Sequence, residues 1–456
     1  MTHTDLTTHT LRARLEETFP TFVQTLIDLI AIPSVSSLPQ HSQDLDRSAQ
    51  YVQQLFSDIG LEARIESVTT PEGVVGKPAV LARSPHIEGA PTVLLYAHHD
   101  VQPTGDPQRW SLEPFTAEVR GDRLYGRGSS DDGAGIVVHL GALNLLARDL
   151  PVNVIVFIEG EEELGSPTFD TFLHTYADEL RADVIIVTDS DNWKVGEPAL
   201  TTTLRGNCCC TLEVTVSEHA VHSGMFGGPM VDATTCASLL ISSFYDEAGN
   251  VRIKGLGGSD KADVDWPEEE FRAAAGILEG VQLAGTGDLA ARVWTKPSIT
   301  VIGWDTTSVA EASNTIAPKT RLRLSMRTVP GIEPEKAMEA LRAHIETHMP
   351  FGAHVTISDV ECGPGYQADL EAPAVELAHR ALTEAWSVPS VNIGVGGSIP
   401  FISQFQSEFP EAQVLVMGVE DPLTNAHSED ESQSLSDLKH AILAEALILR
   451  DLAHKP

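Results

Sequence analysis

The chain has 456 residues, a length that suggests two or three domains at roughly 150 residues per domain. Hydrophobic residues make up 42% of the chain and charged residues 21%, which excludes a disordered protein. The 65 acidic residues against 30 basic ones give a net charge of −35, so we expect neither nucleic acid nor an anionic membrane as a partner. A solvated surface, adaptation to salt and a cation site would each account for the acidic excess.

Targeting signals and disulfides are not expected. Residues 1–14 are polar and lack the apolar segment of a signal peptide, and no apolar run reaches the roughly 18 residues that a membrane span needs. The five cysteines have no CxxC spacing, and three of them are consecutive: Cys208, Cys209, Cys210, Cys236 and Cys362. We therefore expect buried structural thiols in a protein of the reducing cytoplasm.

The first predicted element is a helix, because residues 11–30 have helical apolar spacing and Pro33 follows as a stop. Four short apolar runs come later in the chain, at residues 93–97, 153–158, 183–187 and 414–417. Runs rich in Val and Ile, bounded by polar residues or glycine and separated by helical stretches, predict central parallel strands. The fold class is therefore α/β, with an open, mostly parallel sheet and helices on both faces.

The middle of the chain has a different pattern. Residues 211–217 and 321–327 alternate between apolar and polar side chains, which indicates a sheet buried on one side only. Helical patterns and further strands complete the ferredoxin-like order β-α-β-β-α-β, with the helices at 231–244 and 335–348, the strands near 298–302 and 353–358, and a long insertion at about 249–296. We predict an α/β domain of residues 1–206 and 363–456, with a smaller domain, 207–362, inserted into it.

Side chains suited to binding metals follow all four apolar runs. His98 and Asp100 follow the first run, residues 159–163 the second, Asp189 the third, and His427 lies ten residues after the fourth. Open α/β sheets bind ligands at the carboxyl ends of their strands. His, Asp and Glu gathered there from distant segments are what a hydrolytic site with two metal ions needs.

A glycine-rich segment, residues 126–133, lies between the first two strands and reads Gly-Arg-Gly-Ser-Ser-Asp-Asp-Gly. Taken alone, it is typical of a turn with an Asp that caps the next helix. Beside the same sheet edge, an acidic residue is also placed to bridge two cations.

Other catalytic motifs are not found in the sequence. His344 and His348 have helical spacing, but no Glu follows His344, so the HExxH pattern fails and we expect surface residues. The sequence contains no GxSxG nucleophile elbow and no GxxxxGK[ST] phosphate loop.

Taken together, these motifs resemble the M20 metallopeptidase family. The resemblance spans about residues 20–450 and is carried, in the family's order, by residues 98–100, 126–132, 159–166, Asp189, 222–224 and 426–428. Residues 189–193, Pro198 and residues 204–206 are similar to the dipeptidase branch that includes carnosinase-like enzymes. The resemblance implies a cytoplasmic metal-dependent dipeptidase that hydrolyses the peptide bond of dipeptides with a free C-terminal carboxylate.

Two other functions stay open. An N-acyl amino acid hydrolase of the same family is the first alternative. A metal-containing binding protein without turnover is the second, and Glu162 argues against it because a pure binder needs no base beside its ligands. The family resemblance implies two divalent cations per chain, and the ligand types do not select among Zn, Mn and Co.

The resemblance also implies roles for individual residues. The five metal ligands would be His98 and Asp189 for one ion, Glu163 and His427 for the other, and Asp131 as the bridge. Asp100 would accept the other ring N–H of His98 and fix its tautomer. Glu162 would be the general base, because neighbouring side chains diverge and one carboxylate of the Glu pair can bind metal while the other faces the water.

Further residues are implied to bind the substrate. In related enzymes, an Arg that matches Arg327 and a Gly-Gly-Ser motif that matches residues 396–398, with Gly397 and Ser398, bind the substrate's free carboxylate. Asn314 resembles a substrate-contacting Asn of the family. Without the resemblance, a surface Arg, a tight turn and a turn Asn are ordinary interpretations of these positions.

His222 is implied to act between subunits. In related dimers, the corresponding His of one subunit reaches the partner's active site, where it stabilises the developing oxyanion. The resemblance thus implies a homodimer through the inserted lid and dimerisation domain, with His222 acting in trans. Without the resemblance, His222 is interpreted as a turn residue near glycines.

The chain departs from the family pattern at two places. Gly133 stands where the family often has Lys, and we expect this change to affect the charge around the ligands and not ligation itself. Gly394 and Val395 stand where many dipeptidases have Arg-Glu, which leaves the substrate preference open.

Overall fold

The computed structural model describes residues 6–397 and 399–453. The chain forms two compact units, the first made of Met1–Thr202, Ala368–Asn392 and Gln404–Pro456 and the second of Thr203–Gln367 and Ile393–Ser403. These borders lie within a few residues of 206 and 363, with one difference. Segment Ile393–Ser403, which the sequence analysis placed in the larger domain, belongs to the second unit, because Arg205 binds the carbonyl oxygen of Gly396 there.

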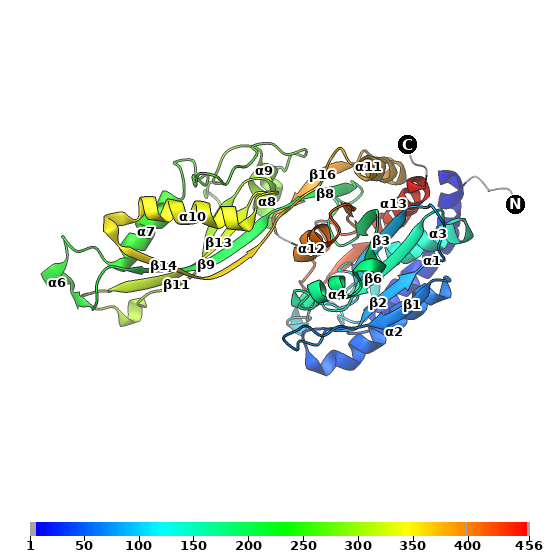
Figure 1. The fold of residues 1–456 in the computed structure, drawn as a ribbon, viewed down its shortest axis with the longest axis horizontal. Coiled ribbons are helices and arrows are strands. Elements are labelled where there is room, and N and C mark those ends of the chain that lie inside the picture. Colours follow the sequence, from blue (N-terminus) through cyan, green and yellow to red (C-terminus); the bar gives the residue numbers. More distant parts are fainter. Residues whose placement is uncertain (1–5, 398, 454–456) are drawn as a thin grey trace. The chain divides into compact units, whose positions relative to one another are not determined.

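The first unit is built on a six-stranded sheet (Figure 1). Its strands, in spatial order, are β1 (Glu62–Glu66), β2 (Ala79–Arg83), β6 (Asn153–Glu159), β3 (Thr92–His98), β7 (Val184–Val187) and β17 (Gln413–Val416). The last four run parallel, and the edge pair β1 and β2 is antiparallel. The four predicted apolar runs therefore form the parallel core of the sheet.

Alternation along β3 explains how both faces of this sheet are covered. Val93, Leu95 and Ala97 belong to the main hydrophobic core, to which helices on one face contribute: α1 (Thr8–Ile30), α2 (Ser42–Asp58), α3 (Gly133–Leu146), α11 (Pro373–Trp386) and α13 (Leu435–Leu452). On the other face, Tyr96 packs edge to face against an aromatic cluster that includes Phe169 of α4 (Phe169–Thr175), near α5 (Ala177–Leu180). The predicted α/β class is confirmed.

Glu159, at the end of β6, is a buried carboxylate that we expect to make the stability of the protein depend on pH. Its buried carboxylate accepts a hydrogen bond from the Tyr96 hydroxyl at 2.6 Å. Burial raises the pKa of Glu159 to about 8, although Tyr96 and Ser166 oppose the shift. Between pH of about 4.5 and 8, the folded state keeps a proton that the unfolded state has released, so the free energy of unfolding falls as pH rises.

We expect Glu159→Gln to remove this pH dependence, because the amide stays neutral at every pH. The stability of the wild type relative to the variant should fall by at most about 1.4 kcal/mol per pH unit across that window. Urea unfolding of both metal-free proteins at pH 5, 6, 7 and 8 measures the difference. Parallel stability curves would show that Glu159 ionises normally in the folded state.

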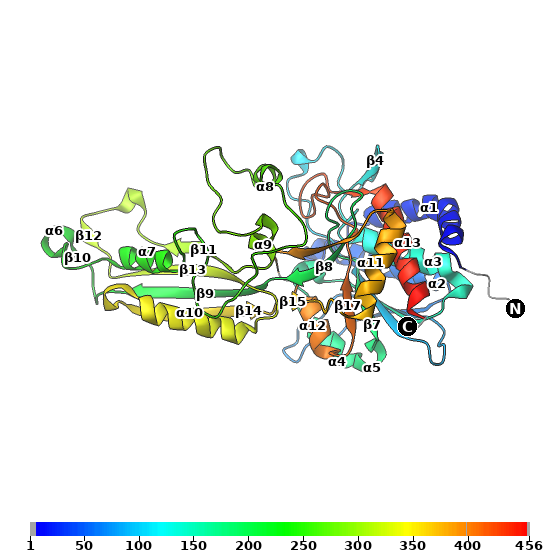
Figure 2. The same cartoon turned by 90° about the horizontal axis from the view of Figure 1, so that it is seen from above.

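The second unit contains a four-stranded antiparallel sheet, visible in the left half of Figure 2. Its strands, in spatial order, are β11 (Ser298–Asp305), β13 (Lys319–Thr328), β9 (Gly206–Thr215) and β14 (His354–Gly363). Helices α7 (Ala233–Ser243) and α10 (Pro334–His348) bury one face, to which alternate residues such as Leu212 and Leu324 contribute. The chain order is the predicted β-α-β-β-α-β.

Shorter elements complete both units. In the second unit, α8 (Glu268–Ala274) and α9 (Leu289–Trp294) lie in the predicted insertion, and β10 (Val221–His222), α6 (Ser223–Phe226), β12 (Thr315–Ile316) and β15 (Tyr366–Gln367) are short. A small sheet of the first unit joins β18 (Ser432–Ser434), β5 (Arg123–Tyr125) and β4 (Glu118–Arg120). Strands β8 (Ala199–Leu204) and β16 (Val391–Val395) contain points where the chain passes between the units.

Two sequence-based expectations need correction. All five cysteines are free, but Cys209 is only half-buried, and Cys362 is exposed because it lies on the edge strand β14. His344 is 7% exposed and stacks on His348, so it is a packed residue of α10 and not a surface residue. Among the described residues, no helix combines the length and apolar character of a membrane span.

Candidate metal centre

The parallel strands of the first unit bring ligand-type side chains to one edge of the sheet. β3 ends at His98, and Asp189 follows β7 by two residues. A single 3-10 turn, Glu162–Leu164, follows β6 and contains Glu162 and Glu163. Because β3, β6 and β7 run parallel and in register, their carboxyl ends lie side by side.

Five of these side chains form two overlapping groups whose ligand atoms lie within 4.8 Å of one another: His98, Asp131 and Asp189, and Asp131, Glu163 and His427. The Nε2 atom of His98 lies 3.0 Å from one carboxylate oxygen of Asp131, and the Nε2 atom of His427 lies 2.8 Å from the other. Asp131 is therefore shared by both groups, with one oxygen toward each imidazole.

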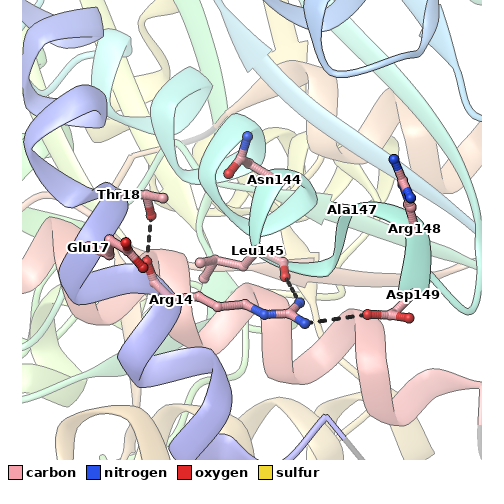
Figure 3. A pocket seen from close by; sticks show the side chains of 8 residues that line it. All are labelled: Arg14, Glu17, Thr18, Asn144, Leu145, Ala147, Arg148 and Asp149. Atoms are coloured by element: carbon pink, nitrogen blue, oxygen red, sulfur yellow. Dashed lines mark hydrogen bonds and ion pairs between the residues drawn. The ribbon is translucent and has the colours of Figure 1, made fainter. Parts of the chain in front are cut away.

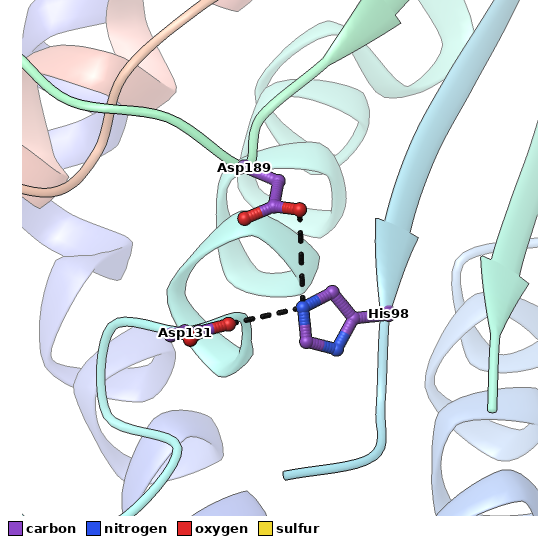
Figure 4. Close-up of side chains that lie close together, drawn as sticks. All are labelled: His98, Asp131 and Asp189. Carbon is purple, nitrogen blue, oxygen red and sulfur yellow. Dashed lines mark ion pairs between the residues drawn. The ribbon is translucent and has the colours of Figure 1, made fainter. Parts of the chain in front are cut away.

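Buried polar atoms without hydrogen-bond partners show that the residues fit metal ions. His98 is fully buried, yet its Nε2 atom makes no hydrogen bond of good geometry. The Oε1 atom of Glu163 is in the same situation. Figure 4 shows the ring of His98 turned toward the carboxylates of Asp131 and Asp189. Unpaired buried imidazole and carboxylate atoms that converge are a donor set suited to divalent transition metals.

The electrostatics of the centre also calls for positive charge. Burial raises the pKa of Asp189 to about 7; the charge of His98 opposes this shift, and repulsion from Asp131 adds to it. Hydrogen bonds to Asp131 and Glu163 raise the pKa of His427 to about 10, although burial opposes the shift. Carboxylates that repel one another at low dielectric are stabilised in their charged form by a cation between them.

Glu162 and Asp100 lie beside these groups. Burial raises the pKa of Glu162 to about 9; His98 lowers it, and Asp189 and Glu163 raise it further. The ring Nδ1 of His98 lies 3.0 Å from the carbonyl oxygen of Asp100 and 3.4 Å from its carboxylate. That carboxylate accepts the backbone N–H groups of Glu162 and Glu163, at 3.2 and 3.1 Å. The Nδ1 atom of His98 therefore lies nearest the carbonyl oxygen of Asp100, with the predicted carboxylate partner at 3.4 Å, and the same carboxylate also binds the turn that contains the Glu pair.

The start of α3 fixes the loop that contains Asp131. Asp132 caps the helix by accepting the N–H of Gly135 with one oxygen, and its other oxygen accepts the N–H of His98. The next residue, Gly133, has no room for a side chain, because a Cβ atom there would lie 2.4 Å from the carbonyl oxygen of Gly128. The departure from the family's Lys at this position thus has a steric reason, which the sequence analysis did not foresee.

Two contacts of the centre were missed from the sequence. The side-chain amide of Gln102 donates to Glu163 at 2.6 Å. The buried carboxylate of Glu161 accepts the N–H of Lys77 and both the N–H and the hydroxyl of Thr168, which anchors the turn that follows β6. Glu161 lies in the recognised motif, but adjacency alone does not distinguish an anchoring Glu from a ligand.

Arg327, at the end of β13 in the second unit, has a second guanidinium beside it. Arg205 is 8% exposed, and burial, followed by the charge of Arg327, lowers its pKa to about 10. Arg205 donates to the carbonyl oxygens of Gly396 and Lys296 and to the hydroxyl of Ser298, at 3.0, 3.3 and 3.2 Å. All three partners of Arg205 are neutral, so none of them compensates its positive charge.

The remaining predicted residues also belong to the second unit. His222 is exposed, and its Nδ1 accepts the N–H of Gly224 at 3.1 Å, which leaves Nε2–H as a donor. Asn314 is exposed, and its carbonyl oxygen accepts the N–H of Ser223, which ties it to the His222 strand. Gly397 is half-buried at a bend after β16, and Ser398 lies outside the described residues.

Gly394 is required where the family has Arg, because a Cβ atom there would lie 2.3 Å from the hydroxyl of Thr203 and 2.7 Å from Trp294. A long basic side chain therefore does not fit at this position of the second unit.

A separate cavity of about 320 Å³ lies in the first unit (Figure 3). It contains none of the ligand-type residues, and it is lined by Arg14, Glu17, Thr18, Asn144, Leu145, Ala147, Arg148 and Asp149. The guanidinium of Arg14 is already bound to the carbonyl oxygen of Leu145 at 2.7 Å and lies 3.5 Å from Asp149. The candidate site is therefore the sheet edge, where the ligand-type side chains converge.

The fold and the shared-carboxylate groups define a metallohydrolase. The family model of Peptidase family M20/M25/M40 matches residues 94–451. A cysteinylglycine-S-conjugate dipeptidase of Corynebacterium striatum is 34% identical over 436 residues, which cover 93% of this chain and 94% of that protein. A Beta-Ala-His dipeptidase of Rattus norvegicus is 27% identical over 90% of this chain and 88% of that protein.

A solved structure shares the fold. The dipeptidase Dug1p from Saccharomyces cerevisiae has a TM-score of 0.73 at 23% identity and covers 100% of both chains. The chain belongs to peptidase family M20/M25/M40, and within it to the dipeptidase branch. The metal-dependent dipeptidase predicted from the sequence is thus confirmed at the level of the family and its activity.

Proposed function

We propose that the enzyme hydrolyses dipeptides with a free C-terminal carboxylate, using two divalent cations held by His98, Asp131, Glu163, Asp189 and His427. The observation that carries this proposal is the pair of ligand groups that share Asp131. Two imidazoles and three carboxylates suit Zn, Mn or Co. Such a pair of cations, when bound, polarises a carbonyl group and lowers the pKa of water from 15.7 toward about 7.

Glu162 is the proposed general base. It accepts a proton from the attacking water as the new C–O bond forms, and then delivers that proton to the nitrogen of the leaving amine as the amide C–N bond breaks. Burial favours the protonated form of Glu162, and cations held beside it would oppose this shift and keep its carboxylate able to accept a proton. Asp100 keeps Glu162 and Glu163 in position through their backbone N–H groups.

Arg327 and Arg205 support recognition of the free carboxylate. A guanidinium binds a carboxylate with two parallel hydrogen bonds, and Arg205 adds positive charge while it holds Gly396 next to Gly397 and Ser398. Asn314 is retained as a further substrate-contacting residue.

We expect Arg327→Ala to raise KM for dipeptides by about 10- to 100-fold, the cost of one charge-assisted hydrogen-bonded contact. Amidation of the substrate's C-terminal carboxylate should harm the wild type far more than the variant. Steady-state kinetics with each dipeptide and its amide make the comparison. Equal losses in both proteins would show that Arg327 does not read the carboxylate.

The test of the activity is a panel of matched substrates with metal-reconstituted protein. The 34% identical relative is named for cysteinylglycine S-conjugates, so Cys-Gly and an S-substituted Cys-Gly head the panel, with β-Ala-His and N-acetyl amino acids beside them. We expect dipeptides to have the highest kcat/KM. Preference for N-acetyl amino acids would favour the alternative, an N-acyl amino acid hydrolase, and no turnover of any substrate would favour a binding protein.

We further propose a homodimer through the second unit, in which His222 acts on the partner's active site. Its free Nε2–H can donate to a developing oxyanion, and loss of such a donor costs about 10²- to 10³-fold in kcat. His222→Ala should therefore lower kcat without loss of metal.

Mixing His222→Ala with Glu162→Gln chains under subunit exchange should restore activity, because one site of the mixed dimer combines an intact Glu162 with an intact His222. An affinity tag on one variant, and recovery of the untagged variant together with it, establishes that exchange has occurred. A well-folded, exchanging mixture as inactive as either parent would rule out action in trans.

A cytoplasmic location is part of the proposal. Its support is the set of five free thiols, because disulfides are rare in the reducing cytoplasm.

A further inference from the structure

Two loops that contain ligand-type residues leave the same small sheet. β5 is followed by residues 126–131, which end in Asp131, and β18 is preceded by residues 427–431, which begin with His427. The two strands pair antiparallel, with Ser432 opposite Tyr125. The loops therefore start side by side, and the N–H of Gly126 donates to the carbonyl oxygen of Glu431 at 3.0 Å.

The carboxylate of Glu431 organises the first loop. It is fully buried, and one oxygen accepts the backbone N–H groups of Ser130 and Asp131 at 2.9 and 3.1 Å. The other oxygen accepts the N–H of Gly128 at 2.9 Å and the guanidinium of Arg127 at 2.6 Å. Four donors use the roughly four lone-pair positions of a carboxylate, so the loop has little freedom to rotate.

Arg127 connects this arrangement to the second loop. Its side chain is 2% exposed, and it donates to the carbonyl oxygen of Ser428 at 3.0 Å, next to His427. It also lies over the ring of Trp110, 5.4 Å from the ring centroid. One buried ion pair thus holds both the main chain of Asp131 and the main chain beside His427.

We propose that Glu431 and Arg127 are positioning residues that fix Asp131 and His427 at the separation needed to bind two cations. This inference rests on the proposed dinuclear function. Neither side chain contacts a ligand side chain, so both act through the backbone. A buried ion pair is weak evidence for stability, because desolvation offsets its attraction, and a geometric role accounts better for its presence at this point.

Asp131 must be held in place because both ligand groups share its carboxylate. Asp131 has one oxygen 3.0 Å from His98 and the other 2.8 Å from His427, so a small rotation of its backbone moves both oxygens. Metal–ligand distances tolerate a deviation of only about 0.2 Å. Loss of the Glu431 carboxylate should therefore weaken the binding of both ions. Loss of the Arg127 guanidinium, which binds both Glu431 and Ser428, should weaken mainly the binding of the ion near His427.

The test is the affinity for Zn²⁺, measured by competition with a chromophoric chelator. In Glu431→Gln an amide N–H₂ replaces one accepting oxygen and faces other donors, so we expect both ions to bind about 10- to 100-fold more weakly than in the wild type. At saturating Zn²⁺, kcat should recover further than at limiting Zn²⁺, with KM unchanged. Arg127→Lys keeps the positive charge but cannot bind Glu431 and Ser428 at once as the guanidinium does. We expect it to weaken the binding of the ion near His427 more than that of the other ion.

Glu445→Gln is the matched control. Glu445 is fully buried like Glu431, and its carboxylate pairs with the imidazole of His139 at 2.9 Å, away from both loops. We expect it to bind Zn²⁺ like the wild type. Thermal unfolding of each metal-free protein separates altered affinity from loss of folding, and Arg127→Lys serves if Glu431→Gln does not fold.

The outcomes separate this inference from the proposed function. Wild-type affinity for both ions in a folded Glu431→Gln or Arg127→Lys protein would overturn the inference, as would an equal loss in Glu445→Gln. A wild-type protein that binds fewer than two Zn²⁺ ions would overturn the dinuclear function instead.

Discussion

Replacing Glu162 by Gln is expected to lower kcat by about 10²- to 10⁴-fold while metal content stays near the wild-type value. The amide keeps the shape of the side chain but cannot take a proton from the attacking water. Because Glu162 is not a member of either ligand group, its loss should leave the cations in place. Steady-state kinetics and elemental analysis of the same preparation measure the two quantities.

Glu163→Gln is the matched comparison, because it makes the same change one residue away. Glu163 lies 3.3 Å from the imidazole of His427 and within one ligand group, so this variant should lose metal first and activity as a consequence. Added metal should restore part of its activity and none of that of Glu162→Gln. Exchanged phenotypes would show that the roles within the Glu pair are reversed.

The sequence was sufficient for residues whose function follows from their place at the end of a strand. His98 directly follows one apolar run and Asp189 follows another by two residues, and parallel strands bring such ends together. The same pattern predicted the fold, because the length and Val and Ile content of the runs set the sheet before any contact was known.

The sequence was insufficient where function depends on a contact between distant segments. Arg205 binds residues 91 and 191 positions away, and no periodicity indicates such a pair. Glu431 lies in the acidic stretch 429–431, where composition does not distinguish it from Glu429, yet Glu431 is fully buried while Glu429 pairs with Arg109 at the surface. Asp100 was placed correctly beside His98, but only the structure shows which of its oxygens contacts the imidazole.

Asp131 provides the strongest test of the dinuclear centre. Wild-type protein loaded with Mn or Zn should contain about two ions per chain. Asp131→Ala removes the one carboxylate that both ligand groups share, so both ions should bind more weakly. Loss of a direct ligand should cost more than the roughly 100-fold upper range for an outer partner, and activity at limiting metal should disappear with the ions.

Asp189→Ala gives the contrast that makes the result specific. Asp189 belongs only to the group of His98, with its carboxylate 3.9 Å from that imidazole, so its loss should weaken one ion and spare the other. Metal titration of both variants, followed by elemental analysis, distinguishes one lost ion from two. A wild type that saturates at one ion with full activity, or an Asp131→Ala protein that loses only one, would exclude a bridging Asp131, because a shared ligand cannot be removed from one site alone.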